Sequence, residues 1–521
     1  MAALSRESRV AVIGSGAMGA GIAQVAAAAG HRVKLYDTQP QAVARALDGI
    51  GRAYAKLVGK GRMTAAEAAA AQGRLQGVDA LSELAGAALA VEAVVEDLDI
   101  KRSLFAELEA VLGDDCILAT NTSSISVTAI AARLRLPQRL AGMHFFNPAP
   151  LMALVEVVSG LATDSAVAAA VFDTAAAWGK SPVHAKSTPG FIVNRVARPF
   201  YAEALRLLTE QAGDAATLDA VMREAGGFRM GPFELMDLIG HDVNFSVTQS
   251  VCQAYFGDPR FTPSVLQQEL VDAGFLGRKS GRGFYRYDAA ATPTPTPTAQ
   301  AEAPQPYPEF VSYASGPCAS SIATRAMAAR LSQAGIHISP RVVLEGAHAS
   351  GAPAFHCNGA SVYLTDGRSA TQRARDDGHP DTVLFDLVFD YATAPRIAVA
   401  CADQCNPAAF AAAVGLFQAA GFAVTRLDDV PGLAVMRTVA MLANEAADAV
   451  YQGVCSARAV DTAMQLGVNY PRGPLAWADA VGIGQVVAVL ANLGAAYGEE
   501  RYRVSPLLRR KLAAGASFHA G

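Results

Sequence analysis

A run of glycines near the start of the chain restricts its fold more than any other feature of the sequence. Residues 9–25 read RVAVIGSGAMGAGIAQV, so that a short apolar run leads into Gly14, Gly16 and Gly19 and then into a helical pattern. Glycines at this spacing permit a tight turn from a strand into a helix and close approach of the backbone to a pyrophosphate. The next apolar run ends at Asp37, eighteen residues after Gly19, where a carboxylate can accept hydrogen bonds from ribose hydroxyls. The pattern predicts a dinucleotide-binding domain, and the absence of an arginine directly after Asp37 favours NAD over NADP.

The first third of the chain alternates short apolar runs with longer helical patterns. Five runs read as buried parallel strands because they are short and almost continuously apolar, at residues 9–14, 31–37, 88–95, 116–121 and 139–146. Helical patterns fill the intervals, for example DIKRSLFAELEAVL at 99–112. This alternation is typical of a doubly wound α/β domain. Beyond it, long helical segments predict an all-α domain.

The helical pattern occurs twice in the sequence. TPGFIVNRVARPFYAEALRLL at 188–208 matches VPGLAVMRTVAMLANEAADAV at 430–450 without a gap, at a constant offset of 242. The same offset pairs Glu203 with Glu445. A Pro/Thr/Ala-rich stretch separates the two halves and is predicted to be an extended linker. We therefore expect a Rossmann-type NAD-binding domain, a helical substrate and dimerisation-type domain, a linker, a degenerate α/β segment and a second helical domain, at residues 1–188, 189–288, 289–308, 309–428 and 429–521.

Composition excludes several classes of function. With 52% hydrophobic and 17% charged residues, a net charge of −4 and a pI near 6.2, the chain has no electrostatic feature that favours nucleic acid or membrane partners. It contains no run of about twenty apolar residues, the length of a membrane-spanning helix. The seven cysteines are scattered and do not form a zinc ligand pattern, so we expect a reduced, cytoplasmic protein without a metal.

Two polar residues stand out in the apolar stretch HFFNPAPLMALVEVVSG at 144–160. His144 ends the fifth predicted strand, and Glu156 lies on the strand that runs back after the Asn-Pro turn. A histidine with a carboxylate behind it forms the pair that removes a hydroxyl proton, because the carboxylate sets the tautomer and stabilises the imidazolium. Each residue could instead be a buried structural group with satisfied hydrogen bonds. The position at the carboxyl edge of the predicted sheet, where open α/β sheets bind ligands, favours the catalytic interpretation.

These residues together resemble the 3-hydroxyacyl-CoA dehydrogenase family. The match runs from residue 9 to residue 287 through VIGSGAMGAGIAQ, EAVVEDLDIK, NTSS, HFFNPAPLMALVEVV, TPGFIVNR, GPFELMDLIG and GRKSGRGFY. The resemblance implies oxidation of an (S)-3-hydroxyacyl-CoA by NAD, with His144 as general base, Glu156 as its partner, and Ser123 and Asn194 as hydrogen-bond donors to the substrate. It further implies CoA contacts at Lys56 and Lys60. Positions that match NAD contacts in the family are Gly14, Gly16, Gly19, Asp37, Glu96, Lys101, Asn121, Asn147 and Lys279.

The length and the second helical copy resemble the long bacterial members of the family, which are associated with phenylacetate breakdown and oxidise 3-hydroxyadipyl-CoA. The alternatives are a 3-hydroxybutyryl-CoA dehydrogenase of short-chain fatty acid metabolism and a non-catalytic, crystallin-like binding protein. A dicarboxylyl substrate would require a cation near the end of its pocket, and Arg195, Arg198 and Arg229 are candidates that the sequence does not rank.

The second half of the chain lacks the catalytic residues. At the same offset Asn194 becomes Met436 and Glu156 becomes Ala398. We therefore expect one active site per chain. The second helical domain is predicted to occupy the surface that short family members use for dimer contact, which would give an intramolecular pseudo-dimer; a further homo-oligomer is an open alternative.

Overall fold

The structure, a computed structural model, describes residues 3–287, 299–315, 322–342 and 352–519. The chain forms two compact units, each of which combines segments that are far apart in the sequence. One unit consists of Met1–Arg195 with Ala449–Val468, and the other of Val196–Asp448 with Asn469–Gly521.

The first unit is built on an eight-stranded sheet. The strand order is β3-β2-β1-β4-β5-β6-β7-β8. All neighbours run parallel except β6 and β7, which are antiparallel. The five predicted strands are confirmed as β1, β2, β4, β5 and β6. The strands are β1 (Arg9–Ile13), β2 (Arg32–Tyr36), β3 (Leu75–Val78), β4 (Ala87–Glu92), β5 (Ile117–Thr120), β6 (Leu140–Phe145), β7 (Leu154–Ser159) and β8 (Ser181–Lys186).

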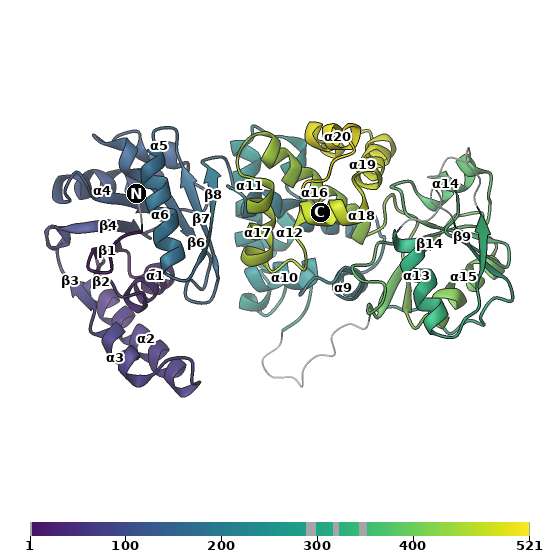
Figure 1. The fold of residues 1–521 in the computed structure, drawn as a ribbon, viewed down its shortest axis with the longest axis horizontal. Helices are drawn as coiled ribbons and strands as arrows, with labels where there is room; N and C mark the ends of the chain where they lie inside the picture. The colour runs from purple at the N-terminus through teal and green to yellow at the C-terminus, as the bar shows by residue number, and fades with distance from the viewer. Residues whose placement is uncertain (1–2, 288–298, 316–321, 343–351, 520–521) are drawn as a thin grey trace. The chain divides into compact units, whose positions relative to one another are not determined.

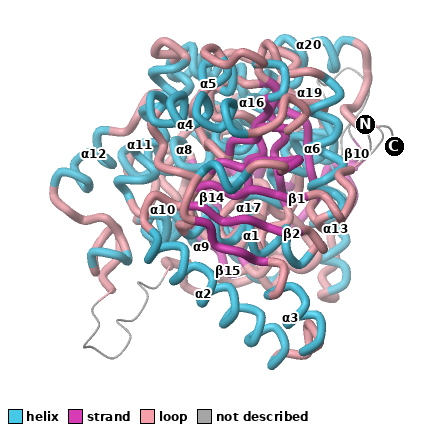
Figure 2. Tube along the Cα trace, turned by 90° about the vertical axis from the view of Figure 1, so that its left-hand side faces the viewer, coloured by secondary structure: helices cyan, strands magenta, loops and turns pink. Residues whose placement is uncertain are grey.

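Helices cover this sheet and extend beyond it. One face forms a continuous apolar core in which alternate strand residues pack against α1, α2 and α6. The hairpin of α2 and α3 projects away from the sheet (Figures 1 and 2). The helices are α1 (Ala17–Ala28), α2 (Pro40–Gly59), α3 (Ala65–Gln72), α4 (Leu98–Val111), α5 (Val127–Ala131), α6 (Ser165–Ala177) and α7 (Val193–Val196), with 3-10 turns at Leu81–Leu84 and Pro137–Arg139.

The predicted helical domain is present in two copies. The first contains α8 (Arg198–Thr209), α9 (Ala215–Ala220), a π-helical turn (Val221–Ala225), α10 (Pro232–Ile239), α11 (His241–Ala254), α12 (Val265–Asp272) and 3-10 turns at Pro259–Phe261 and Arg278–Ser280. The second contains α16 (Val435–Tyr451), α17 (Ala457–Val468), α18 (Pro474–Val481), α19 (Ile483–Tyr497), a 3-10 turn (Glu500–Tyr502) and α20 (Pro506–Ala513). The first and last residues of α18 each lie 242 positions after those of α10, which is the offset found in the sequence.

The segment between the helical copies forms a second, smaller sheet, as predicted. Its strand order is β10-β9-β11-β12-β13-β14-β15, with parallel and antiparallel neighbours. The elements are β9 (Val311–Ser315), α13 (Ile322–Gln333), β10 (Ser339–Val342), β11 (Phe355–Cys357), β12 (Ala360–Leu364), α14 (Ala370–Asp377), β13 (Thr382–Phe385), β14 (Arg396–Cys401), α15 (Pro407–Ala419) and β15 (Ala423–Arg426). Strand β14 and helix α15 lie at offset 242 from β7 and α6 at both ends, so the repeat includes part of the α/β domain. Figure 2 shows the helices and strands by type.

Contacts between the two copies are reciprocal. In the first unit the backbone N–H of Lys186 donates to Val454, and in the second unit the backbone N–H of Asp428 donates to Ala212. At the offset of 242, Lys186 corresponds to Asp428 and Ala212 corresponds to Val454, so each of these bonds is the counterpart of the other. Helix α17 also contacts β7 and β8, and β14 contacts the π-helical turn of the first copy. Each helical copy therefore packs against the α/β part of the other copy.

The second part of the predicted linker is attached to the fold. Residues 289–298 lie outside the described residues. The backbone N–H of Gln300 donates to Thr217 Oγ1, and the backbone N–H of Glu302 donates to the carbonyl oxygen of Val424. Residues 299–308 carry no helix or strand, as a linker would, but they are held by both α9 and the smaller sheet.

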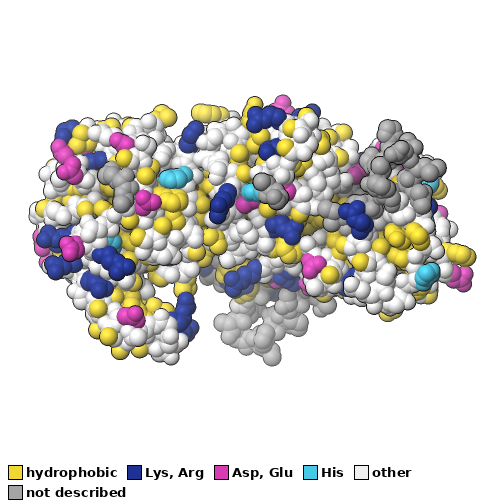
Figure 3. Space-filling view, in the orientation of Figure 1, with side chains coloured by type: hydrophobic (Ala, Val, Ile, Leu, Met, Phe, Trp, Pro, Cys, Tyr) yellow, Lys and Arg dark blue, Asp and Glu magenta, His cyan; other side chains and the backbone are white. Residues whose placement is uncertain are grey.

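Two further observations concern the described surface and helices. On the face drawn in Figure 3, Lys and Arg side chains occur in small separate groups. Among the described helices, none is by itself long and apolar enough to cross a membrane; α18 and α19 satisfy the length and composition test only when joined across a 100° bend.

Candidate functional site

The turn from β1 into α1 is built from backbone groups in close approach. Gly14 has a φ of +99°, and a Cβ atom there would lie 2.4 Å from the carbonyl oxygen of Ala93. A Cβ atom at Gly19 would lie 1.8 Å from the carbonyl oxygen of Gly14. One at Gly16 would meet no described atom within 4 Å. Packing therefore requires glycine at Gly14 and Gly19, whereas Gly16 faces open space.

The first turn of α1 offers backbone N–H groups to that space. Gly16 is the N-cap residue, and no described side chain caps the helix there. Uncapped N–H groups at the positive end of a helix dipole suit a pyrophosphate. A cavity of about 620 Å³ adjoins the turn, and its walls include Ser15, Gly16, Asp37 and Arg45. The residues present fit the diphosphate and ribose of a dinucleotide.

Asp37 follows β2, and its carboxylate is fixed by the glycine turn. Oδ2 accepts hydrogen bonds from the backbone N–H and the hydroxyl of Ser15 at 2.7 and 2.8 Å. Oδ1 accepts from the backbone N–H of Gln39 at 3.1 Å. Burial by itself would raise the pKa of Asp37, but these hydrogen bonds hold the pKa below its usual value. The ionised carboxylate is therefore available as an acceptor for ribose hydroxyls.

Lys101 holds two glutamates at the end of β4. Its ammonium lies 2.6 Å from Glu92 Oε1 and 3.3 Å from Glu96 Oε2, and its side chain is 1% exposed. The hydroxyl of Thr120, on the neighbouring strand β5, donates to the other oxygen of Glu92 at 2.7 Å. Buried charges persist when they are paired in this way. The structure thus places Lys101 in a buried ion pair, and a contact between Lys101 and NAD stays a prediction.

Glu96 organises the polar loop that follows β5. Its Oε1 atom accepts from the hydroxyl of Thr122 at 2.7 Å and from the backbone N–H groups of Ser123 and Ser124 at 2.9 and 3.1 Å. Burial by itself would raise the pKa of Glu96, but the bonds from Thr122 and Ser123 and the charge of Lys101 lower it below its usual value. Because Glu96 stays ionised, it fixes the loop that carries Ser123.

His144 and Glu156 form a close polar pair between two neighbouring strands. They are directly opposite each other in the antiparallel pair β6–β7. Nδ1 of His144 lies 2.6 Å from Oε2 of Glu156, and the two side chains are 7% and 1% exposed. The other carboxylate oxygen accepts the backbone N–H groups of Ile192 and Val193, each at 3.0 Å. The pairing predicted from the sequence is therefore present as a geometric fact.

The arrangement of His144 and Glu156 is suited to general base catalysis. A carboxylate that already accepts two backbone N–H groups acts as an acceptor toward the imidazole, so that the proton resides on Nδ1 of His144. Nε2 then carries the lone pair and can accept a proton from a hydroxyl group. The rings of Phe146 and Phe191 lie 4.5 and 5.9 Å from the imidazole, between ring centroids, and limit its rotation.

Ser123 and Asn194 lie next to each other. The Asn194 amide donates to the carbonyl oxygen of Ser123 at 3.3 Å, and the hydroxyl of Ser123 lies 3.2 Å from Glu96 Oε1. Asn121 accepts the backbone N–H of Phe145 at 2.9 Å, which joins the ends of β5 and β6. The structure therefore gathers Ser123, Asn121, Glu96 and Asn194 in the unit that contains His144.

Other predicted residues lie apart from this cluster. Lys56, in the last turn of α2, and Lys60, its C-cap residue, are exposed on the projecting hairpin. Asn147 is exposed in the turn between β6 and β7. Lys279 belongs to the other compact unit, where its ammonium lies 2.5 Å from Asp242. The roles predicted for these residues stay predictions.

Two residues of the site were missed from the sequence. Thr120 binds Glu92, and its signal was a polar residue at the end of an otherwise apolar strand. Arg45 lines the cavity beside Asp37, but it lies eight residues further along the chain, on α2, where nothing in the local sequence connects it to the glycine turn. Within the described ranges, no three His, Cys, Asp or Glu side chains group as metal ligands.

A Gly-x-Gly-x-x-Gly turn with an acidic residue on the next strand, and a His–Glu pair in the same unit, define a nicotinamide-nucleotide-dependent dehydrogenase. The family models agree over most of the chain. The model of the 3-hydroxyacyl-CoA dehydrogenase NAD binding domain matches residues 9–188, and that of the C-terminal domain matches residues 190–287 and 432–518. The model of the 3-hydroxybutyryl-CoA dehydrogenase reduced Rossmann-fold domain matches residues 362–431. The chain belongs to the 3-hydroxyacyl-CoA dehydrogenase family, whose members act with NAD on acyl-CoA substrates.

Similar proteins exist over both the whole chain and its first half. The chain is 44% identical over 503 residues to the 3-hydroxyadipyl-CoA dehydrogenase of Escherichia coli K12, covering 96% of this chain and 97% of that protein. A solved structure of the 3-hydroxybutyryl-CoA dehydrogenase from Escherichia coli K12 covers 98% of this chain, with 42% identity and a TM-score of 0.85. The probable 3-hydroxybutyryl-CoA dehydrogenase of Deinococcus radiodurans is 40% identical over 276 residues, 53% of this chain and 99% of its own length. The long form and the short form of the family thus share the first half of this chain.

Proposed function

We propose that this 3-hydroxyacyl-CoA dehydrogenase oxidises 3-hydroxyadipyl-CoA to the 3-ketoacyl thioester in the breakdown of phenylacetate. The observation that carries the chemistry is the 2.6 Å contact between His144 Nδ1 and Glu156 Oε2. The choice of substrate is supported by the 44% identity, over nearly the full length of both chains, to the Escherichia coli protein of that name.

The proposed mechanism assigns one task to each residue of the cluster. His144 accepts the proton of the 3-hydroxyl group at Nε2, and Glu156 stabilises the imidazolium that forms. Ser123 and Asn194 donate hydrogen bonds to substrate oxygens and orient C3 of the acyl chain. Bound NAD⁺ supplies the hydride acceptor for the oxidation at C3.

Binding sites for NAD and for CoA are proposed in the first half of the chain, with one further NAD contact at Lys279. Gly14, Gly16 and Gly19 would admit the pyrophosphate, and Asp37 would accept the ribose hydroxyls. Further contacts to NAD are proposed for Glu96, Lys101, Asn121, Asn147 and Lys279. Lys56 and Lys60 would bind CoA phosphates, because two ammonium groups four residues apart near the end of a helix form one cationic face.

The test is NADH formation by the purified protein with 3-hydroxyadipyl-CoA and with 3-hydroxybutyryl-CoA. We expect kcat/KM to be higher for the dicarboxylyl thioester. A preference for the four-carbon thioester would contradict the proposed substrate and favour the short-chain alternative, which the name of the similar solved structure supports. No turnover of either thioester, with NAD still bound, would favour the non-catalytic, crystallin-like alternative.

We further propose that the two helical copies act as a pseudo-dimer within one chain. Glu203 is fully buried, and its carboxylate pairs with Arg437 and Arg501 of the second copy, at 2.7 and 3.3 Å. A chain that ends at residue 287 lacks both arginines, so Glu203 would lose the cations that compensate its charge. We expect such a chain to dimerise or aggregate in sedimentation experiments; a soluble, fully active monomer would contradict the proposal.

A further inference from the structure

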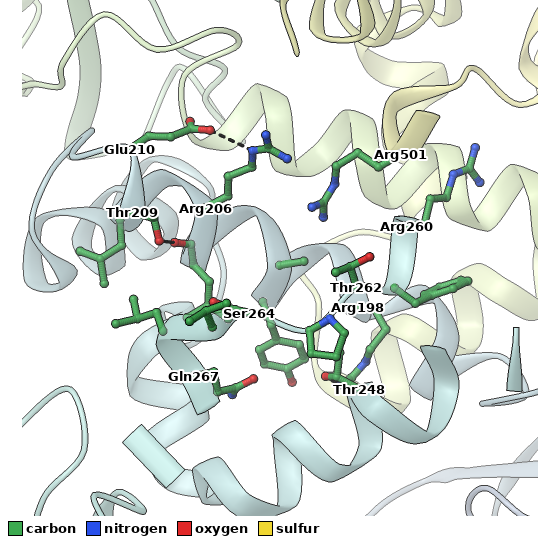
Figure 4. Close-up of a pocket in the computed structure, with 18 residues that line it drawn as sticks. Arg198, Arg206, Thr209, Glu210, Thr248, Arg260, Thr262, Ser264, Gln267 and Arg501 are labelled. Atoms are coloured by element: carbon green, nitrogen blue, oxygen red, sulfur yellow. Dashed lines mark hydrogen bonds and ion pairs between the residues drawn. The ribbon is translucent and has the colours of Figure 1, made fainter. Parts of the chain in front are cut away.

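The second compact unit contains a cavity that the proposed chemistry does not use. Its volume is about 750 Å³, within the range of small-molecule sites, and it lies among α8, α11, α12 and the turn at Pro259–Phe261. Four arginines line it, namely Arg198, Arg206, Arg260 and Arg501. Figure 4 shows the Arg206–Glu210 pair on one side of the cavity and Arg198 beside Thr248 on another.

Three of these arginines are paired with carboxylates. Arg206 lies 2.9 Å from Glu210 and 2.5 Å from Glu499. Arg260 lies 3.0 Å from Glu445 and also pairs with Asp448, and Arg501 lies 3.3 Å from Glu203. Their charges are therefore compensated within the protein.

Arg198 differs because it faces no carboxylate among the described residues. It is 6% exposed, and Nη1 donates to Thr248 Oγ1 at 3.0 Å, while its buried Nε atom has no hydrogen-bond partner. Burial lowers the pKa of Arg198, and the phenols of Tyr201 and Tyr470 are the groups that oppose this shift. A buried guanidinium normally pairs with an anion, because an isolated charge is costly in a low-dielectric interior. An unpaired one on a cavity wall indicates that the anion comes from outside the described fold.

The remaining walls of the cavity suit a chain of methylene groups. The ring of Tyr201 packs against the guanidinium, at 4.9 Å from its central carbon. The apolar side chains of the lining include Leu205, Leu208, Phe261, Pro263, Val265 and Leu266, and its further polar side chains are Thr209, Glu210, Thr262, Ser264 and Gln267, of which Glu210 is paired with Arg206. One cation without a carboxylate partner, at the wall of a largely apolar space, fits a ligand with one carboxylate and an aliphatic chain.

We infer that this cavity binds an aliphatic carboxylate, with the carboxylate on Arg198 and the chain along the leucines and Phe261. Two sources can supply this chemistry. One is a free aliphatic acid, and the other is the far end of a dicarboxylyl acyl chain; the second source rests on the proposed function. Arg198 follows Asn194, the proposed substrate contact, by four residues in the sequence.

The first experiment tests the cavity with free acids. Calorimetric titration compares adipate, hexanoate and uncharged hexanamide as ligands of the full-length protein and its Arg198→Met, Arg198→Lys and Arg229→Met variants. Arg229 is the matched control because it is an exposed arginine of the same helical copy. We expect the two carboxylates to bind at least about tenfold more tightly than the amide, the scale of a hydrogen-bonded charge. Arg198→Met should remove this difference, Arg198→Lys should retain part of it, and Arg229→Met should leave it unchanged.

The second experiment tests the acyl chain as the source. The ratio of kcat/KM for 3-hydroxyadipyl-CoA to that for 3-hydroxybutyryl-CoA is measured for the same proteins. If the cavity receives the distal carboxylate, Arg198→Met lowers this ratio at least about tenfold, and adipate competes with the dicarboxylyl thioester. If the ratio is unchanged but free acids bind through Arg198, the ligand is a free acid.

The inference is overturned if Arg198→Met alters neither acid binding nor the substrate ratio. Thermal unfolding separates this result from a folding defect. Replacing an unpaired buried charge by an apolar side chain of similar length should not lower the melting temperature of the ligand-free protein, whereas a purely structural arginine would. If the wild-type protein turns over neither thioester, the proposed function fails. The calorimetric titrations with free acids still test whether the cavity binds a carboxylate.

Discussion

The two halves of the chain carry the same strand pair with different polar residues. In the first half His144 on β6 faces Glu156 on β7. In the second half, at offset 242, Asp386 follows β13 and faces Ala398 on β14, whose carbonyl oxygen accepts the backbone N–H of Asp386. The strands are retained, whereas the histidine and its carboxylate partner are absent.

The two carboxylates lie on different strands of the pair but have the same structural role. Glu156 lies on β7, whereas Asp386 follows β13, the counterpart of β6. Glu156 accepts the backbone N–H groups of Ile192 and Val193, at the start of the first helical copy. Asp386 accepts the corresponding N–H groups of Ala434 and Val435, at 2.9 and 2.7 Å. Both carboxylates therefore satisfy N–H groups at a helix start, which would otherwise be buried without partners. The comparison separates two roles of Glu156: it fixes a helix start and it orients His144.

The largest expected effect concerns the residue that the second half lacks. We predict that His144→Asn lowers kcat about 10²–10⁴-fold, the usual scale for loss of a general base. NAD binding, measured by fluorescence titration, should persist because His144 is not part of the glycine turn. The matched control is His184→Asn, on β8 of the same sheet, which should leave kcat unchanged. A loss of less than tenfold for His144→Asn, with NAD still bound, would contradict its role.

The next effect separates the two roles of Glu156. In Glu156→Gln the amide oxygen can still accept from Ile192 and Val193, but the amide nitrogen would face His144 and favour the wrong tautomer. We predict a fall in kcat of about 10²-fold or more with little change in the melting temperature. Glu107→Gln, at an exposed position of α4, serves as the control. A variant that unfolds but retains kcat per folded molecule would mean that Glu156 serves the helix start alone.

Much of the site could be predicted because its parts are local in the sequence. The glycine spacing, the acidic residue after the second strand and the β6–β7 hairpin can each be recognised within a short stretch of sequence, and the period-two register of a hairpin determines which residues face each other. The prediction of a His144–Glu156 pair needed only the turn length, and the structure has the two residues directly opposite.

What could not be predicted depends on contacts between distant segments. The buried ion pair of Lys101 with Glu92 was not predicted, because the burial of both side chains is not visible in EAVVEDLDIK. The sequence did not rank Arg195, Arg198 and Arg229, because their partners lie elsewhere in the chain. The structure distinguishes them: Arg195 bonds to Gln452, Arg229 is exposed, and Arg198 is buried beside a cavity.

The third prediction tests the structural role of the carboxylate in the second half. Asp386→Asn would place amide hydrogens against the N–H groups of Ala434 and Val435. We predict a loss of about 1–3 kcal/mol in the free energy of unfolding, the cost of buried groups left without partners. Because this position lies outside the catalytic cluster, kcat per folded molecule should be unchanged. A large fall in kcat at full stability would contradict the division of roles between the two halves.

The difference in stability between the wild type and Asp386→Asn should depend on pH. Burial raises the pKa of Asp386 to about 6, although four backbone N–H groups oppose the shift. The folded state thus binds the proton more tightly than the unfolded state, in which the pKa is near 4. The contribution of this group to stability is largest below pH 4 and is lost as the pH rises through 6, by at most about 3 kcal/mol. The stability gap between wild type and Asp386→Asn should therefore widen from pH 7 to pH 5; a gap that narrows would mean that the pKa is lowered.

The smallest effect concerns a polar contact that differs between the copies. Arg437 lies 3.0 Å from Glu210, whereas its counterpart Arg195 donates to Gln452 at 2.9 Å, and Gln452 occupies the position of Glu210. Gln452→Glu would introduce a carboxylate at this place. Because residue 452 is exposed, we predict a gain of only about 0.2–1 kcal/mol, measured by urea unfolding. High salt should abolish the gain, and Gln452→Ala, which removes the acceptor, should be less stable than wild type. If Gln452→Glu instead destabilised the protein at every salt concentration, the contacts of Arg195 and Arg437 would not be equivalent, and the reciprocity of the two copies would not extend to their polar contacts.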